Sequence, residues 1–298
     1  MKQTLSVWMP NYNHAAYVGR AIEAVVSQSR LPDEFVVIDD ASTDNSKEVL
    51  QQYAAKYPWI RIEYSAKNEG VLAIMQRAVE TCASDYLFLT AADDFIVPGF
   101  FETAMELAEK YPQAGILFGQ MKAQSDTGAD LYIGKASQYA NSQYISSEEY
   151  LQYMRDEAPN HSLSAGTIYN ANVLREVGGF QTQLGPWTDT FSIQAIALKY
   201  GAVYMAQVVS VWVIHTGSVS QVVRKSPLFM FGIIKEAIGV MKSPVFHQYF
   251  PDGYVRSWAM KYRITILLQY VAGVLHVSSL ATSPVVQSWH KKLLQVVM

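Results

Sequence analysis

The amino-acid sequence predicts an α/β protein, with a mixed sheet flanked by helices and a helical region at its carboxyl end. Apolar runs of strand length alternate with segments of helical periodicity through the first half of the chain. Two of these runs lead directly into paired carboxylates. With 298 residues, half of them apolar, the chain can bury a substantial core in one large domain, or in a domain with an appendage.

Four apolar runs define the predicted strands of the first half, at residues 5–9, 35–38, 60–64 and 86–89. The segments between them, at 17–28, 46–56 and 71–82, have the apolar spacing of helices. Strand, helix and strand at this spacing are typical of right-handed crossovers, which build a parallel sheet. Pro98 and Gly99 predict the start of a further helix over 100–111.

Beyond Pro112 the predicted order of elements becomes mixed. Segments 115–122 and 131–133 flank a polar turn, which predicts a hairpin. The later elements are a helix opened by the capping box of Ser146 and Glu149, a helix capped by Asn170 and ended by Gly178, a helix over 189–200, and strands at 202–206 and 208–214. We place one domain boundary, which gives a domain over 1–220 and a carboxyl-terminal region over 221–298.

The carboxyl-terminal region is basic. From Arg224 onward, the chain has nine Lys and Arg residues but only two acidic residues, Glu236 and Asp252. This gives a local charge of +7 within a net charge of −3. With its interleaved aromatic residues, this region could lie on anionic lipid or bind an anionic acceptor. A packed helical appendage with solvated charges explains the same pattern equally well.

Residues 264–289 contain no charged side chain, but polar residues and Pro284 interrupt the run, so we do not expect it to span a membrane. Its helical apolar stripe suits packing or the seam of a homodimer. The lone Cys82 allows no internal disulfide, and residues 5–9 are too short for a signal peptide. We therefore expect a cytoplasmic protein, with peripheral contact at the inner face of the membrane as a hypothesis for the basic region.

Paired carboxylates follow two of the predicted strands. Asp39 and Asp40 come directly after the run 35–38, and Asp93 and Asp94 follow the run 86–89. Ligands of open α/β sheets bind beyond the carboxyl ends of the strands, and acids there can hold ribose hydroxyls or a divalent cation. The two pairs together predict one nucleotide site.

An ordered series of short motifs runs along the first 220 residues. The motifs are Val7 to Asn13 with its Pro-x-Tyr-Asn turn, Ser27-Gln28, Ile38 to Asp44, Asn68-Glu69-Gly70, the pair Asp93-Asp94, and Gly178-Gly179-Phe180 ahead of Asp189. In this order they resemble the family 2 glycosyltransferases over roughly residues 4–220. The resemblance implies the GT-A fold, a Rossmann-like mixed sheet, and inverting transfer of a sugar from a nucleotide diphosphate donor.

The resemblance also implies a set of nucleotide-binding residues. They are Pro10, Asn11, Tyr12, Asn13, Asp39, Asp40, Asn68 and Gly70. By analogy Asp39 accepts a hydrogen bond from the base or the ribose, which suits a carboxylate because it is an acceptor only. The alternative for both aspartates is ordinary turn and helix-capping chemistry.

Asp93 is the expected ligand of a divalent cation, Mn²⁺ or Mg²⁺, that neutralises the diphosphate leaving group. The family usually has Asp-x-Asp here, whereas this chain has Ala91 in the first place, which puts metal affinity in doubt. His215 is a second candidate at the metal, because relatives often show His-x-Gly-Ser-x-Ser at this place. Its alternative is a hydrogen-bonded residue at the end of a strand.

Asp189 occupies the place of the catalytic base, which removes the proton of the acceptor hydroxyl. A partly closed pocket beside Trp187 would raise the pKa of this carboxylate, and capping of the following helix is a compatible second role. Thr188 stands where the family has a glutamate. Asp94, Trp187 and Arg224 are the remaining candidates for contact with donor or acceptor.

These residues predict an inverting glycosyltransferase that uses a UDP-sugar and a saccharide or lipid-linked acceptor, in surface polysaccharide synthesis and with no nucleic-acid partner. Because Ala91 and Thr188 replace acids, the alternative is a nucleotide-sugar-binding protein without turnover. A sugar-1-phosphate nucleotidylyltransferase ranks last, since it requires a Gly-rich basic loop after the first strand. The sequence has no zinc-spaced Cys/His cluster, no Gly-x-Ser-x-Gly elbow and no Gly-x-x-x-x-Gly-Lys loop.

Overall fold

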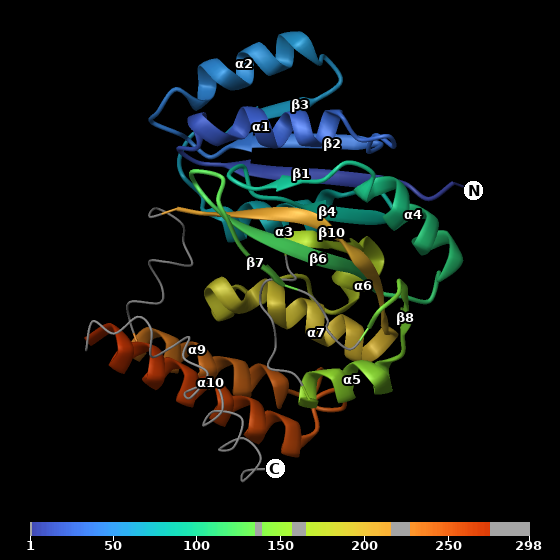
Figure 1. Cartoon of the computed structure of the whole chain (residues 1–298), viewed down its shortest axis with the longest axis vertical. Coiled ribbons are helices and arrows are strands. Elements are labelled where there is room, and N and C mark those ends of the chain that lie inside the picture. Colours follow the sequence, from blue (N-terminus) through green and yellow to red (C-terminus); the bar gives the residue numbers. More distant parts are fainter. Residues whose placement is uncertain (1, 135–138, 157–164, 216–226, 275–298) are drawn as a thin grey trace. The chain divides into compact units, whose positions relative to one another are not determined.

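The computed structural model describes residues 2–134, 139–156, 165–215 and 227–274 of the chain. The chain forms two compact units (Figure 1). The first comprises Met1–Thr182 and Asp189–His215, and the second comprises Gln183–Thr188 and Thr216–Met298. The boundary predicted at residue 220 and the candidate Arg224 both lie in the segment 216–226, outside the described residues.

The first unit contains the sheet and most of the helices. Its elements are β1 (Leu5–Asn11), α1 (Ala15–Val26), β2 (Glu34–Asp39), α2 (Ser46–Lys56), β3 (Arg61–Tyr64), α3 (Val71–Thr81), β4 (Tyr86–Leu89), β5 (Phe95–Ile96), α4 (Phe100–Lys110), β6 (Ile116–Ser125), β7 (Asp130–Gly134), β8 (Gln143–Ile145), α5 (Ser147–Asp156), β9 (Thr167–Asn170), α6 (Ala171–Glu176), α7 (Thr188–Tyr200) and β10 (Ala202–Ile214).

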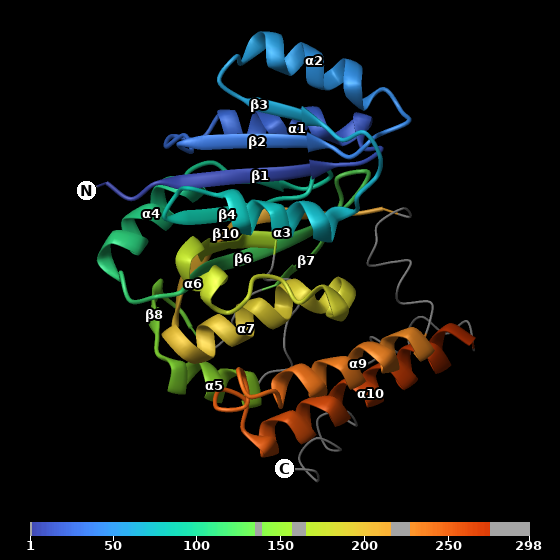
Figure 2. The ribbon, with the colours of Figure 1, turned by 180° about the vertical axis from the view of Figure 1, so that it is seen from behind.

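The strands form a mixed sheet in the order β3-β2-β1-β4-β9-β6-β10-β5, with β7 paired to β6 and β8 to β10. Strands β1 to β4 are parallel, whereas β9 runs antiparallel to both β4 and β6. Helices α1 and α4 cover one face (Figure 1), and α3 and α6 lie on the opposite face (Figure 2). The predicted mixed sheet flanked by helices is confirmed.

Strand β1 lies in the middle of the sheet and is buried on both faces. Leu5, Val7 and Met9 contribute to the core beneath α1 and α4, while Trp8 is buried on the other side. A strand covered on both faces has a nearly continuous apolar sequence, and this explains why the run 5–9 predicts it so well. Its carboxyl end, at Asn11, is where polar residues begin.

The sequence pattern did not predict three short strands, β5, β8 and β9, which have two to four residues each. Strands β5 and β8 are too short for a sequence periodicity, and β9 (Thr-Ile-Tyr-Asn) lacks the continuous apolar run that predicts β4, so only pairing with neighbours defines them. The two strands predicted at 202–206 and 208–214 are one strand, β10, whose register against β6 shifts at Met205, Val208 and Ser210. The polar Gln207 lies at this irregularity, which is why the sequence suggests a break.

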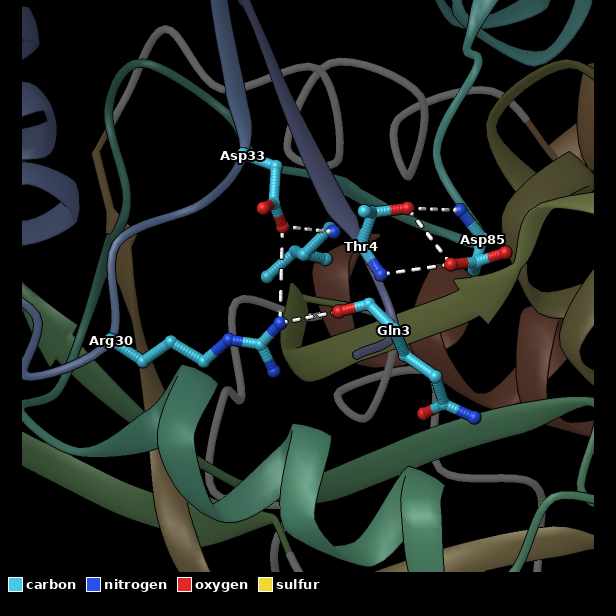
Figure 3. A network of polar contacts seen from close by, with 6 residues as sticks. Gln3, Thr4, Arg30, Asp33 and Asp85 are labelled. Atoms are coloured by element: carbon cyan, nitrogen blue, oxygen red, sulfur yellow. Dashed lines mark hydrogen bonds and ion pairs between the residues drawn. The ribbon is translucent and has the colours of Figure 1, made fainter. Parts of the chain in front are cut away.

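The amino end of β1 is held by side chains from two neighbouring loops (Figure 3). Thr4 donates its backbone N–H and its hydroxyl to one carboxylate oxygen of Asp85, each at 2.9 Å. Asp33 accepts the backbone N–H of Leu5 at 2.8 Å and lies 3.8 Å from Arg30. These contacts join β1 to the starts of β2 and β4, so the opposite, carboxyl ends of the strands meet at one edge.

The second unit contains η2 (Thr182–Trp187), α9 (Pro227–Met241) and α10 (Asp252–Val274). The indole of Trp187 is buried, with its ring centre 4.6 Å from that of Trp258 and 6.2 Å from that of Tyr262. Within residues 227–274, neither helix is long and apolar enough to cross a membrane. The remainder of the predicted dimer or membrane segment, from residue 275, lies outside the described residues.

Candidate active site

The turn after β1 is fixed by an unusual backbone conformation at Asn13. This residue has φ of +56°, in the left-handed region that asparagine tolerates better than most residues. The next residue, His14, is the N-cap of α1, and its carbonyl accepts the backbone N–H groups of Tyr17 and Val18, each at 2.9 Å. The imidazole of His14 makes no capping hydrogen bond to the helix.

A second turn, after β2, is bonded to the first. The Asn13 side-chain oxygen accepts the N–H of Thr43 at 2.7 Å, and the Asn13 N–H donates to the Ser42 hydroxyl at 2.9 Å. Asp44 accepts the N–H of Ala15 at 2.9 Å and that of Ser46 at 3.0 Å, so one carboxylate serves the starts of both α1 and α2. The two turns therefore form one rigid unit at the carboxyl ends of β1 and β2.

Asn11 and Asp39 are buried side by side at this edge of the sheet. They are register partners in β1 and β2, and the Asn11 amide donates to Asp39 Oδ1 at 2.8 Å. Within the described part of the chain, the buried Asn11 Oδ1 has no hydrogen-bond partner. A buried acceptor of this kind is costly unless a ligand supplies a donor. Pro10 lies in the same strand, and Tyr12 is 44 % exposed directly after it.

Asp40 faces a different partner from Asp39. Its two carboxylate oxygens accept the backbone N–H groups of Glu69 and Gly70, each at 2.8 Å. Gly70 has φ of +84° at the start of α3, a conformation that favours glycine. Asp40 therefore holds the loop of Asn68 and Gly70 against the end of β2, and its predicted direct contact with nucleotide remains a hypothesis.

Replacement of Asp40 by alanine is expected to destabilise the protein by about 2–3 kcal/mol, because two hydrogen bonds to a buried carboxylate are lost. Urea denaturation measures this change. Asp40→Asn retains one side-chain oxygen as an acceptor and should lose about half as much. Asp126→Ala, in an exposed turn, is the matched control. Equal stability of Asp40→Ala and the control would contradict this role.

Asp93 and His215 come together from distant parts of the sequence. Asp93 follows β4 and His215 follows β10, and His215 Nε2 lies 2.8 Å from Asp93 Oδ2. His14 completes the group, because one ligand atom from each of the three residues lies within 4.8 Å of the others. Sequence reasoning missed His14, although its place directly after the Pro-x-Tyr-Asn turn was a signal that could have found it.

Asp94 makes a different contact, to the backbone at the end of β10. It accepts the backbone N–H of Val213 at 2.9 Å, two residues before His215. Burial raises the pKa of the Asp94 carboxyl well above its ordinary value, and the charge of Asp93 adds to this shift. Asp94 therefore holds the strand that carries His215, and a contact with donor or acceptor remains a prediction.

Asp189 lies in the first turn of α7, where the helix dipole stabilises a carboxylate. Its Oδ1 accepts the N–H of Thr190 at 2.6 Å. Its charge reaches the buried Tyr169 of β9, whose pKa is raised well above its ordinary value first by burial and then by Asp189. Trp187, two residues earlier in the chain, belongs to the aromatic cluster of the second unit.

The fold is that of an α/β protein, and these residues form a candidate ligand site at the carboxyl ends of its parallel strands. The sequence profile of glycosyl transferase family 2 matches residues 6–178, more than half of the chain. The chain therefore belongs to glycosyl transferase family 2, and the resemblance seen in the sequence motifs is confirmed.

Similar curated proteins match about a third of the chain. The chain is 35% identical over 104 residues to YibD, an uncharacterized glycosyltransferase of Escherichia coli strain K12, covering 35% of this chain and 30% of YibD. It is 31% identical over 102 residues to chondroitin synthase of Escherichia coli, covering 34% of this chain and 15% of the synthase. The matched stretch thus spans less than a third of the length of either relative.

Solved structures with the same fold match nearly the whole chain. Staphylococcus aureus TarS residues 1–349 in complex with UDP-GlcNAc has a TM-score of 0.65 at 14% identity, covering 90% of this chain and 73% of TarS. The mannosyltransferase PcManGT from Pyrobaculum calidifontis, in complex with GDP-Man and Mn²⁺, has a TM-score of 0.59 at 17% identity, covering 100% and 86%. These likenesses show the GT-A fold.

Proposed function

We propose that this chain is an inverting glycosyltransferase that moves a sugar from a UDP-sugar to a hydroxyl of a saccharide or lipid-linked acceptor. The observation that carries the proposal is the meeting of Asp93 and His215 at 2.8 Å, beside strand ends that also hold Asn11 and Asp39. Nitrogen and carboxylate ligands beside a base-binding edge suit a nucleotide diphosphate with its cation.

The nucleotide binds, in this proposal, at the edge formed by β1 and β2. The partnerless Asn11 Oδ1 and the carboxylate of Asp39 are both acceptors, which suits an N–H of the base or a ribose hydroxyl. Tyr12, with its ring partly exposed, supplies apolar surface for the base. Pro10, Asn13, Asn68 and Gly70 shape the surrounding turns.

Asp93 and His215 would hold Mn²⁺ or Mg²⁺, since their oxygen and nitrogen already lie close together in a largely buried pair. The bound cation supplies positive charge against the diphosphate as it leaves. In the proposed reaction, Asp189 acts as the general base and takes the proton of the acceptor hydroxyl while that oxygen bonds to the anomeric carbon. The bond from this carbon to the diphosphate oxygen breaks, so a single displacement inverts the configuration.

The biological setting is inferred from relatives and from charge. TarS has been solved with UDP and with UDP-GlcNAc, which supports a uridine donor. The similarity to a chondroitin synthase supports a role in surface polysaccharide assembly. Arg256 and Arg263 are exposed on α10, and an anionic lipid-linked acceptor or lipid surface suits such a helix. We therefore place the enzyme in the cytoplasm, at or near the inner face of the membrane; a homodimer remains a prediction.

Release of UDP from a panel of UDP-sugars in the presence of Mn²⁺ tests turnover directly. We expect the protein to release UDP from at least one UDP-sugar faster than UDP appears in buffer without protein. The release should be faster still when a saccharide acceptor is supplied. Proton NMR of the product then reports an inverted anomeric centre. Tight binding of UDP together with no release from any sugar or acceptor would instead support a nucleotide-sugar-binding protein without turnover.

A further inference from the structure

The group at the end of β4 contains an imidazole where the family usually has an acid. We propose that His14 is a third protein ligand of the cation and replaces the carboxylate missing at Ala91. The site then has two imidazoles and one carboxylate, binds Mn²⁺ or Co²⁺ in preference to Mg²⁺, and does so before nucleotide arrives. This inference rests on the proposed function, which it refines.

The geometry of the three side chains already approaches that of a metal site. Their ligand atoms lie within 4.8 Å of one another. At metal–ligand bonds of about 2.1 Å, two ligands on one ion lie at most about 4.2 Å apart. The widest separation must therefore close by at least about 0.6 Å, and by more if the two ligands occupy adjacent positions on the ion. His14 is half-buried, so its ring has room to make this movement.

The backbone on both sides of His14 is held by hydrogen bonds. The preceding residue, Asn13, is tied to Ser42 and Thr43, and the following residue, Ala15, is tied to Asp44. The carbonyl of His14 begins α1, while its imidazole makes no bond to the helix end. A side chain whose backbone is held, and whose ring is not used to cap the helix, is well suited to bind a ligand.

His215 is oriented from the same helix. The ring of Tyr17 stacks on that of His215, with centres 5.3 Å apart and planes at 19°. The His14 ring meets His215 edge to face, at 5.8 Å and 78°. Since residues 14 and 17 lie one helical turn apart, α1 presents both rings to His215. The stacking holds the plane of His215, and with it the direction of Nε2 toward Asp93.

The donor set determines which ion is favoured. Imidazole nitrogen suits first-row transition ions, whereas Mg²⁺ prefers oxygen ligands and keeps its waters. Exchange of a carboxylate for an imidazole also removes one negative charge from the site. The charge that attracts Mg²⁺ is thereby reduced, while the imidazole nitrogen is a better ligand for Mn²⁺ or Co²⁺ than for Mg²⁺. The preference between Mg²⁺ and transition-metal ions therefore distinguishes a site that contains His14 from one with the usual two acids.

Pulsed electron paramagnetic resonance of the full chain with Mn²⁺ alone tests the inference. We expect nitrogen couplings from two imidazoles in the unaltered protein and from one in His14→Ala, with affinity at least tenfold lower in the variant. His14→Asp restores an acid and should shift selectivity toward Mg²⁺. His247→Ala, an exposed histidine between α9 and α10, should change neither affinity nor couplings. Circular dichroism checks that each variant folds.

Two results would overturn the inference and leave the proposed function intact. One is a His14→Ala protein that keeps both nitrogen couplings and full Mn²⁺ affinity. The other is an unaltered protein that binds Mn²⁺ only when UDP is present. The proposed function itself fails on a different result, namely no UDP binding with any cation, so the two failures are distinguishable.

Discussion

Asp189→Asn is expected to lower kcat by about 10²–10⁴-fold, the usual contribution of a general base. The amide has nearly the same shape as the carboxylate but cannot take a proton from the acceptor hydroxyl. Affinity for UDP and Mn²⁺ should stay within about twofold, since the contacts proposed for them lie on β1, β2, β4 and β10. Steady-state transfer assays, paired with calorimetry of UDP binding, measure both quantities.

The control for Asp189→Asn is Asp126→Asn, which changes an exposed carboxylate of the β6–β7 turn. Thermal melting of both variants separates a chemical effect from a structural one, because Asp189 also accepts the N–H of Thr190 in the first turn of α7. Transfer at the unaltered rate in Asp189→Asn would exclude this residue as the base.

Asp93→Ala is expected to weaken Mn²⁺ binding by about 100-fold or more, because it removes the only carboxylate of the group. Metal-dependent affinity for UDP should fall with it. The change also leaves His215 without its 2.8 Å partner, while its ring contacts with Tyr17 and His14 remain. Titration of Mn²⁺ followed by electron paramagnetic resonance measures the affinity.

Asp94→Asn is an informative companion to Asp93→Ala. Its side chain can still accept the N–H of Val213, so β10 should keep its position and Mn²⁺ affinity should change little. If both variants lost Mn²⁺ equally, a general effect on local structure would explain the loss. If neither lost it, Asp93 would not be the ligand.

Most of the first half of the fold could be predicted because its signals are local. Helix α2 and strand β4 have the predicted bounds, and Ser146 and Glu149 form both hydrogen bonds of the predicted capping box. Strand β9, in contrast, has four residues that become a strand only by insertion between β4 and β6. Such pairing depends on residues distant in sequence, which a local pattern does not contain.

In the candidate site, too, local features could be predicted and contacts between distant residues could not. Acids after β2 and β4 could be predicted from sequence, but their individual orientations could not. Asp39 and Asp40 are adjacent, and successive side chains along a strand point to opposite faces. Asp39 therefore meets Asn11, and Asp40 meets the backbone of Glu69 and Gly70. His14 joins Asp93 and His215 only because the turn after β1, the loop after β4 and the end of β10 meet in three dimensions.

Calorimetric titration of the full chain with UDP, with and without Mn²⁺, tests the central claim most directly. The claim is that strand ends carrying Asn11, Asp39, Asp93 and His215 form a metal-dependent nucleotide diphosphate site. We predict measurable UDP binding that strengthens at least tenfold with Mn²⁺ and loses this gain in Asp93→Ala. No binding of UDP under either condition, or of any other nucleoside diphosphate, would contradict the claim.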